Sequence, residues 1–286
     1  VQSLAAITRD DLVAYRRAWW HPANISVVVT GGIEPTSAGA LAERLFGDWK
    51  AEGLAPKLPK SRAGAAQPPR TIVVDLPGAG QAAVLAAVRG VSRSDADYLS
   101  LLLANSVLGV GSNGRLFTEV RSKRALSYGA YSSMPARADT ALLSASAQTK
   151  NESATEVAEI FLNEFKRLGA EAITPDALAK RRAFLEGAYG RQQETGGGYG
   201  AIVAGLILQG LQPAAALDYA ARLGAVTPEA ANAIAAKTVV PDNASLIVVG
   251  DAAKFIDKLR TLRPDLIVIP ASKLDLDSPT LGAEAR

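Results

Sequence analysis

Cysteine is absent from this 286-residue sequence, and histidine and methionine occur once each. Without cysteine the chain forms no disulfides, zinc fingers or thiol nucleophiles. The single histidine, His21, cannot build a zinc site that needs two or more imidazoles. No apolar run reaches about 18 residues, so no transmembrane helix is expected. These absences exclude several self-contained metal, redox and membrane roles.

Charge of one sign is also scarce, because 31 basic residues face 28 acidic ones and leave a net charge of +3. Such a small and evenly spread excess does not predict binding to nucleic acid or to an anionic membrane. The first residues contain neither the basic start nor the apolar core of a signal peptide. Hydrophobic residues, many of them alanine, make up 48% of the chain, which predicts a sizeable core and many helices.

An internal repeat is the most informative pattern in the chain. Each copy reads as a capped helix, a Pro-x-Asn turn, a β-branched strand and a glycine, with Thr8 and Thr227 as predicted N-caps. Five identities recur at a constant offset of 219 residues, which favours common ancestry over chance similarity. These five pairs are Thr8 and Thr227, Pro22 and Pro241, Asn24 and Asn243, Val29 and Val248, and Gly31 and Gly250.

The repeat predicts the domain organisation. The second copy ends a unit that begins near Pro69, whereas the first copy stands at the start of the chain. A segment comparable to residues 69–225, roughly 150 residues, is therefore expected before Val1 in a complete protein. The predicted parts are a C-terminal remnant of a first unit (1–50), a proline-rich linker (51–70), a complete second unit (71–270) and a polar tail (271–286).

Hydrophobic periodicity in the second unit predicts strands near its two ends and helices between them. Strands are expected at 71–76, 81–88, 126–135 and 139–148, and helices at 94–108, 114–124, 153–168, 174–193, 199–209 and 214–223, before the second repeat copy. The alternation of small and apolar residues in 126–148 suits an antiparallel sheet with one covered face. The predicted fold class is therefore α+β, with helices packed on one face of an antiparallel sheet.

Two glycine clusters and the lone histidine are candidate sites. Residues 109–114 spell G-x-G-x-x-G, but a dinucleotide site needs a preceding strand and an acidic residue about 20 positions on. A helix is expected before this motif, and position 134 is Met134, so a flexible helix-to-helix loop is favoured and a peptide-contacting loop is the alternative. The cluster at 194–200 is expected to break a helix, and His21 to be a helix-terminal turn residue.

Arg121 and Tyr128 lie seven positions apart, across an expected junction between a helix and a strand. The residues alone favour a solvated arginine and a tyrosine packed on a strand. The alternative is a pair of donors aimed at a peptide carbonyl, since a guanidinium and a phenol both donate well to a developing oxyanion.

The segment around this pair resembles a known family. Arg115-Leu-Phe-Thr-Glu-Val-Arg121, followed by Ala125-Leu-Ser-Tyr128, is similar to the R-L-F-x-E-x-R-x-x-x-G-L-x-Y segment of pitrilysin/insulinase zinc metallopeptidases. That segment belongs to the second homologous unit of the family, and the stretch from Thr8 to Gly31 resembles the end of its first unit. The resemblance extends over residues 7–260, roughly, and the arginine-to-tyrosine segment is its most specific part.

In this family, duplicated α+β units enclose a peptide chamber, and an inverted H-x-x-E-H motif in the first half binds zinc and supplies a glutamate base. The resemblance implies that Arg121 and Tyr128 bind the peptide backbone and stabilise the tetrahedral intermediate. It also implies that Phe117 lines a side-chain pocket. Residues 109–114 fall where related processing-peptidase subunits carry a longer glycine-rich loop that contacts substrate.

This sequence departs from the family pattern in two ways: Ala125 replaces the usual glycine, and no H-x-x-E-H motif is present. The resemblance therefore implies a zinc-free, substrate-binding part of a metalloendopeptidase that is inactive alone. Its zinc is expected either on a missing N-terminal portion or on the partner subunit of a dimer, and the second arrangement is preferred. The alternative is a non-catalytic scaffold of the same fold, as in respiratory-complex core subunits, and a third reading is an unrelated α+β binding module.

Retention of both Arg121 and Tyr128 favours the peptidase role over the scaffold. The expected partners are a peptide substrate and a zinc-bearing subunit or N-terminal half, with no nucleic acid. Bacterial relatives of this kind are often exported, so the resemblance implies a periplasmic location, with the cytoplasm as the alternative.

Overall fold

A computed structural model describes residues 2–50, 53–57 and 63–282 of the chain. These residues form two compact units. The smaller unit contains the described residues up to 57 together with Tyr189–Leu217, and the larger contains Ala63–Ala188 and the described residues from Asp218 onward. Residues 51–52 and 58–62 of the predicted linker, and residues 283–286 of the predicted tail, lie outside the described residues.

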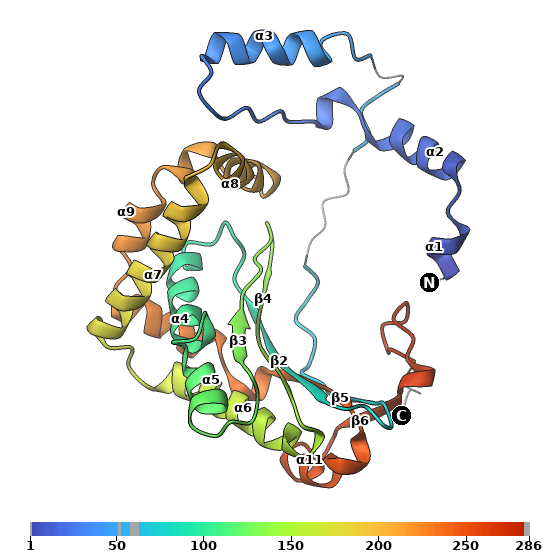
Figure 1. The fold of residues 1–286 in the computed structure, drawn as a ribbon, viewed down its shortest axis with the longest axis vertical. Coiled ribbons are helices and arrows are strands. Elements are labelled where there is room, and N and C mark those ends of the chain that lie inside the picture. The colour runs from blue at the N-terminus through green and yellow to red at the C-terminus, as the bar shows by residue number, and fades with distance from the viewer. Residues whose placement is uncertain (1, 51–52, 58–62, 283–286) are drawn as a thin grey trace. The chain divides into compact units, whose positions relative to one another are not determined.

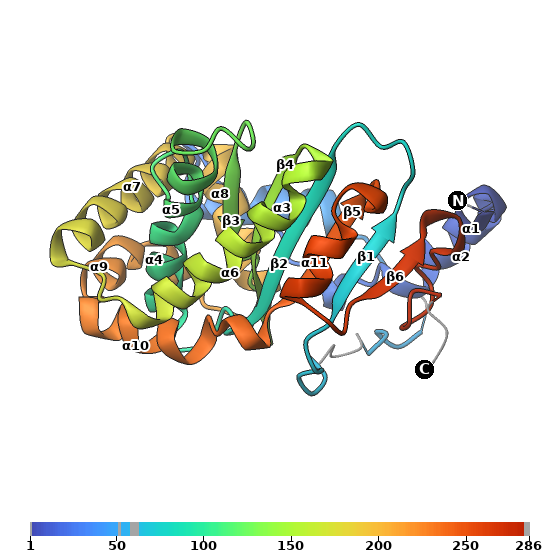
Figure 2. The same cartoon turned by 90° about the horizontal axis from the view of Figure 1, so that it is seen from below.

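The larger unit is built on one six-stranded sheet, which Figure 1 shows edge-on and Figure 2 from its helical side. The strand order is β3-β4-β2-β5-β1-β6. The strands are β1 (Thr71–Asp75), β2 (Ala82–Gly90), β3 (Ala130–Ser133), β4 (Ala141–Thr149), β5 (Ser245–Gly250) and β6 (Ile267–Pro270). The predicted α+β class with a helix-covered sheet is therefore confirmed.

Strand direction in this sheet is mixed. The neighbours β3 and β4, β4 and β2, and β2 and β5 are antiparallel, as the sequence predicts. In contrast, β1 lies parallel to both β5 and β6. Helix α11 (Ile256–Leu262) connects β5 to β6, and a helical crossover of this kind returns the chain in the same direction. The expectation of a wholly antiparallel sheet is wrong for these two pairings.

Helices cover one face of the sheet, and Figure 2 shows α6 and α11 crossing that face. The other helices of this unit are α4 (Tyr98–Gly109), α5 (Arg115–Phe117), α9 (Tyr219–Gly224), α10 (Pro228–Thr238) and the first part of α7 (Pro175–Gln193), with α6 spanning Ala154–Ala170. The prediction of a single helix at 214–223 is wrong. These residues form a 3₁₀ turn, η4 (Pro213–Ala216), and then α9, which begins after Asp218.

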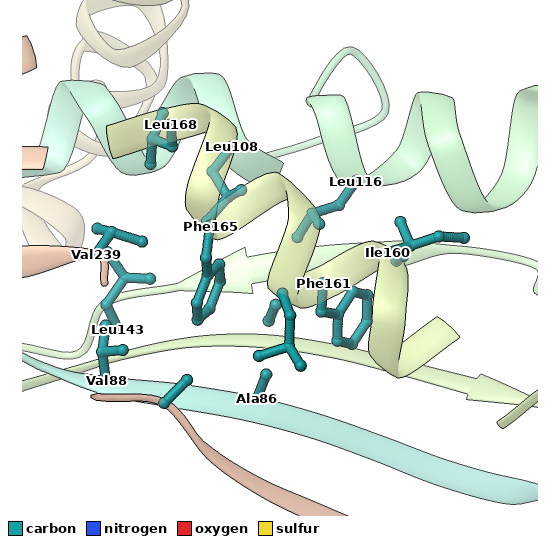
Figure 3. Close-up of a cluster of buried hydrophobic side chains, with 14 of the residues drawn as sticks. Ala86, Val88, Leu108, Leu116, Leu143, Ile160, Phe161, Phe165, Leu168 and Val239 are labelled. Carbon is teal, nitrogen blue, oxygen red and sulfur yellow. The ribbon is translucent and has the colours of Figure 1, made fainter. Parts of the chain in front are cut away.

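The core lies between α6 and the sheet. Figure 3 shows Phe161 and Phe165 of α6 pointing toward β2 and β4, where Ala86 and Leu143 lie. Both phenylalanines are fully buried, and each contributes about 1.5–3 kcal/mol by leaving water. Their spacing of four residues places them on one helix face. The apolar stripe predicted from the sequence is therefore the buried face of α6.

The smaller unit contains α1 (Gln2–Ala6), α2 (Arg9–Trp19), η1 (Pro22–Asn24), α3 (Pro35–Phe46), the end of α7, α8 (Gly196–Leu208) and η4. Thr8 caps α2 as predicted: its hydroxyl accepts the Asp11 amide at 3.2 Å, and the Asp11 carboxylate accepts the Thr8 amide at 2.8 Å. Thr227 caps α10 in the same way, with a 3.2 Å bond from the Ala230 amide. α2 and α10 begin and end 219 positions apart.

Among the described residues, no helix is long and apolar enough to cross a membrane. The break expected in the second glycine cluster is present, because α7 ends at Gln193 and α8 begins at Gly196.

Candidate functional site

A groove of about 910 Å³ lies on the sheet face that the helices leave uncovered. Ala83 and Leu85 of β2 line the groove and alternate with the core residues Ala82, Val84 and Ala86, of which Val84 also contributes to the lining. Ile247 and Val249 of β5 continue this lining. The period of two along a strand therefore divides β2 and β5 into a core side and a groove side.

Arg121 reaches this groove from a π-helical turn. α5 continues directly into η2 (Thr118–Ser122), where the Lys123 amide donates to the Thr118 carbonyl at 2.9 Å. Leu116 and Val120 attach the turn to the core, since both side chains are fully buried there, while Arg121 is exposed. Single π turns inside helices are rare and are frequent at functional sites.

The turn ends at Ala125, which adopts a left-handed conformation with φ of 51°. The Ala125 amide donates to the Arg121 carbonyl at 3.1 Å, and the Leu126 amide donates to the Val120 carbonyl at 2.9 Å. The first of these is the single bond of an αL helix ending, which usually places glycine at the left-handed position. The left-handed conformation therefore gives a physical reason why the pitrilysin/insulinase segment has glycine at the position of Ala125.

Tyr128 stands on a loop that hydrogen bonds attach to β4. The Thr149 hydroxyl donates to the Leu126 carbonyl at 2.6 Å. The buried Ser127 hydroxyl lies 2.5 Å from the Gln148 carbonyl and accepts the Gly129 amide at 3.2 Å. Since the residues on both sides are held, Tyr128 projects outward, and it is 90% exposed. The expectation of a tyrosine packed on a strand is wrong, because β3 begins only at Ala130.

The structure brings Arg121 and Tyr128 together at the groove. The guanidinium carbon of Arg121 lies 5.8 Å from the centroid of the Tyr128 ring, and both residues line the groove. Within the described part of the chain, Arg121 forms no ion pair, unlike its neighbours Lys123 and Arg124. The lining contains a second cation, Lys150, and no acidic side chain. The donors of this pair are thus available to an external acceptor.

Phe117 does not line the groove. It is half-buried, and its ring centroid lies 5.9 Å from that of Tyr131, which does line the groove. Tyr131 points away from the core because it alternates with the buried Ala130 and Ser132 on β3. Strand alternation was the signal that could have identified Tyr131 from the sequence.

The glycine loop at 109–114 is closely packed at its two ends, and its flexibility stays a prediction. A Cβ on Gly109 would lie 2.6 Å from the Ser132 amide nitrogen, and a Cβ on Gly114 would lie 2.6 Å from the Gly109 Cα. The buried Arg181 of α7 donates to the Val110 carbonyl at 3.2 Å. No residue of this loop lines the groove.

No group of three or more His, Asp or Glu side chains in the described residues could hold a metal ion. His21 is a turn residue, as expected: it caps η1, and its Nδ1 accepts the Ala23 amide at 3.2 Å. A resident zinc ion therefore does not fit the described residues of this chain.

Comparison with known proteins agrees with this architecture. Residues 6–185 match the family described as the peptidase M16 inactive domain. An uncharacterized zinc protease of Streptomyces coelicolor is 27% identical over 259 residues, which are 87% of this chain and 55% of that protein. An uncharacterized zinc protease of Bacillus subtilis is 24% identical over 65% of this chain and 44% of its own length. The chain thus spans about half the length of these relatives.

Solved structures share the fold. The crystal structure of a peptidase M16 inactive domain from Pseudomonas fluorescens matches with a TM-score of 0.74 and 23% identity, over 87% of this chain and 59% of that one. A protease from Helicobacter pylori matches with a TM-score of 0.76 and 17% identity, over 87% and 60% of the two chains. A chain of complex III2 from Candida albicans matches with a TM-score of 0.74 and 15% identity, over 93% and 64%. With a family match over more than half of its length, this chain belongs to the peptidase M16 inactive domains.

Proposed function

We propose that this chain is the zinc-free, substrate-binding part of a metalloendopeptidase, and that Arg121 and Tyr128 hold the peptide backbone. The observation that carries the proposal is the pair itself: two donor side chains lie together in the lining of a groove that contains no acidic side chain, with the Arg121 guanidinium carbon 5.8 Å from the centroid of the Tyr128 ring. A groove of about 910 Å³ has room for several residues of an extended peptide.

The chemistry of the pair suits acyl transfer to water. Peptide hydrolysis passes through a tetrahedral intermediate whose carbonyl oxygen gains negative charge, and fixed donors aimed at that oxygen lower the barrier. The Arg121 guanidinium presents several N–H groups and the Tyr128 phenol presents one O–H. Both sit on backbone fixed by hydrogen bonds, so little reorganisation is needed during the reaction.

Zinc and the base that activates water come from outside this chain in our proposal, on a preceding segment or on a partner subunit. The relatives named zinc proteases, of whose length this chain spans only about half, support such an arrangement. Residues 1–50 would then be the end of a first unit, and residues 71–270 would form a second unit. If the zinc is instead on a partner subunit, this chain would work as one subunit of a dimer. We also propose a periplasmic location.

The test is peptide cleavage by the assembly that contains both this chain and the zinc-bearing part. Replacing Arg121 with Ala, or Tyr128 with Phe, is expected to lower kcat/KM on the order of 100-fold, the usual cost of one oxyanion donor. Arg93→Ala is a matched control, because Arg93 also stacks on a tyrosine, Tyr98, at 4.2 Å but does not line the groove. Its kcat/KM should stay at the wild-type value.

A scaffold role is the second candidate, supported by the structural likeness to a chain of complex III2. The same experiment separates the two. Unchanged kcat/KM in both Arg121→Ala and Tyr128→Phe would reject the donor role and favour the scaffold.

A further inference from the structure

Two charged residues of the segment from Arg115 to Tyr128, Arg115 and Glu119, have no part in the function proposed above. Arg115 begins α5 and Glu119 lies on the π turn that carries Arg121, and neither residue lines the groove. Their side chains instead meet charged residues on α6 and at its C-cap. This set, which we call the α6 charged row, consists of Glu156, Glu164, Arg167 and the C-cap Glu171.

Glu119 is the centre of the contacts on the turn. Its carboxylate accepts Lys123 Nζ at 2.7 Å and Arg124 Nη1 at 2.6 Å, and Arg124 Nη1 also reaches the Glu119 carbonyl at 2.9 Å. The hydrogen bonds from Lys123 and Arg124 lower the pKa of Glu119, so it is ionised at neutral pH. Arg124 thus binds both the side chain and the main chain of Glu119, and these two bonds connect the residues after the π turn to the turn itself.

Three ion pairs then connect the turn to α6. Arg167 Nη1 lies 3.9 Å from Glu119, Arg115 Nη1 lies 3.7 Å from Glu171, and Arg124 Nε lies 3.8 Å from Glu156. They contact both ends of α6, since Glu156 lies in its first turn, Arg167 in its last turn and Glu171 is its C-cap. Rotation of the turn about its own axis would therefore break at least one of these pairs.

One member of the α6 charged row, Glu164, is buried, and burying a charge is costly. The Glu164 side chain is only 3% exposed, and it binds Arg167 at 2.5 Å. Burial raises the pKa of Glu164, although Arg167 opposes that shift. Glu164 Oε2 and Arg115 Nη1 are buried without a hydrogen-bond partner among the described residues. Buried ion pairs are weak sources of stability compared with apolar packing, so this network calls for another role.

We propose that Glu119 and Arg124 are positioning residues, which fix the π-helical turn against the α6 charged row and thereby set the direction of Arg121. Arg121 is the one basic side chain of residues 121–124 with no acidic partner in the described structure, while Lys123 and Arg124 are both bound to Glu119. This inference rests on the proposed role of Arg121 in holding peptide.

The test is a double-mutant cycle in the zinc-containing assembly. Glu119→Gln keeps the shape of the side chain and removes its charge. It is expected to lower kcat/KM on the order of 10- to 100-fold, the cost of a small misplacement of a catalytic group. In an Arg121→Ala background the same substitution should change kcat/KM by less than about twofold, because it acts through Arg121. Arg124→Met is a second variant with the same expectation, used where Glu119→Gln does not fold.

The exposed pair Asp176 and Lys180, 2.7 Å apart on α7, supplies the control, and Asp176→Asn should leave kcat/KM unchanged. An equal loss from Glu119→Gln in both backgrounds would mean a general structural effect and would overturn the positioning role. A loss from Arg121→Ala alone, with Glu119→Gln and Arg124→Met fully active, would overturn only this inference. Full activity of Arg121→Ala would overturn both this inference and the proposed function.

Discussion

At the scale of single residues, Ala125 is, with Leu281, one of two described non-glycine residues whose backbone is left-handed. A left-handed φ of 51° costs an L-residue roughly 1–2 kcal/mol, and glycine avoids that cost while losing more entropy on folding. We therefore expect Ala125→Gly to raise the free energy of unfolding by about 1 kcal/mol. For a domain of this size the midpoint of thermal unfolding should rise by about 2–4 °C.

A matched substitution distinguishes this effect from a general effect of glycine. Ala179 is exposed within α7, where the backbone is helical, so Ala179→Gly should lower stability by about 0.5–1 kcal/mol. If Ala125→Gly lowered the midpoint as Ala179→Gly does, the left-handed conformation at Ala125 would be wrong.

The sequence predicted the two central side chains of the groove and missed those that hold them. Arg121 and Tyr128 stand in a recognisable motif with fixed spacing. Ser127 and Thr149, in contrast, act through main-chain carbonyls 21 and 23 positions away. Serine and threonine carry no spacing signal for such bonds, and their partners are known only once β4 lies beside the loop. Phe117 contacts Tyr131 and does not line this groove, so its role in a side-chain pocket stays a prediction.

At the scale of secondary-structure elements, Gly109 controls how closely the end of α4 approaches β3. A Cβ at this position would lie 2.6 Å from the Ser132 amide nitrogen and 2.7 Å from a Leu116 methyl carbon. Neither neighbour is free to move, since Leu116 is fully buried and Ser132 is in a strand. Gly109→Ala should therefore destabilise the larger unit by about 1–3 kcal/mol, the usual cost of overpacking. Chemical denaturation gives this value directly.

Gly190 is the control for that experiment. It lies within α7, and a Cβ there would meet nothing within 4 Å. Gly190→Ala should leave stability unchanged or raise it by up to about 1 kcal/mol through helix propensity. Equal effects of the two substitutions would contradict the close packing at Gly109.

Elements with a strong apolar period were predicted well, and elements defined by distant pairing were not. α6 differs from its predicted range by only one residue at its start and two at its end, because Phe161 and Phe165 mark one buried face. β6 was not predicted, since its four residues carry too short a pattern and its partner β1 lies almost 200 residues earlier in the chain. The π turn also escaped prediction, because one inserted residue leaves the helical apolar period of Leu116 and Val120 intact.

At the scale of the whole molecule, the two repeat copies differ most in what covers them. In the larger unit, Leu246 and Val248 of β5 are fully buried between β1 and β2. The corresponding Val27 and Val29 of the smaller unit are 48% and 40% exposed. The amides of residues 26–30 have no hydrogen-bond partner among the described residues, and the segment belongs to no helix or strand. A β-branched segment with unpaired amides is a candidate strand that lacks neighbours.

This contrast leads to a prediction for the assembly. If residues 1–50 complete a unit whose other strands come from the zinc-bearing part, residues 26–30 should pair with them as β5 pairs with β1 and β2. Amide hydrogen exchange at 26–30 should be fast in this chain alone and slow by at least about 100-fold in the assembly, since exchange from a central strand needs larger unfolding. Residues 245–250 are the internal control and should be slow in both samples. Fast exchange at 26–30 in an assembly that cleaves peptide would show that the segment joins no sheet, and the truncated first unit would then be the wrong description of residues 1–50.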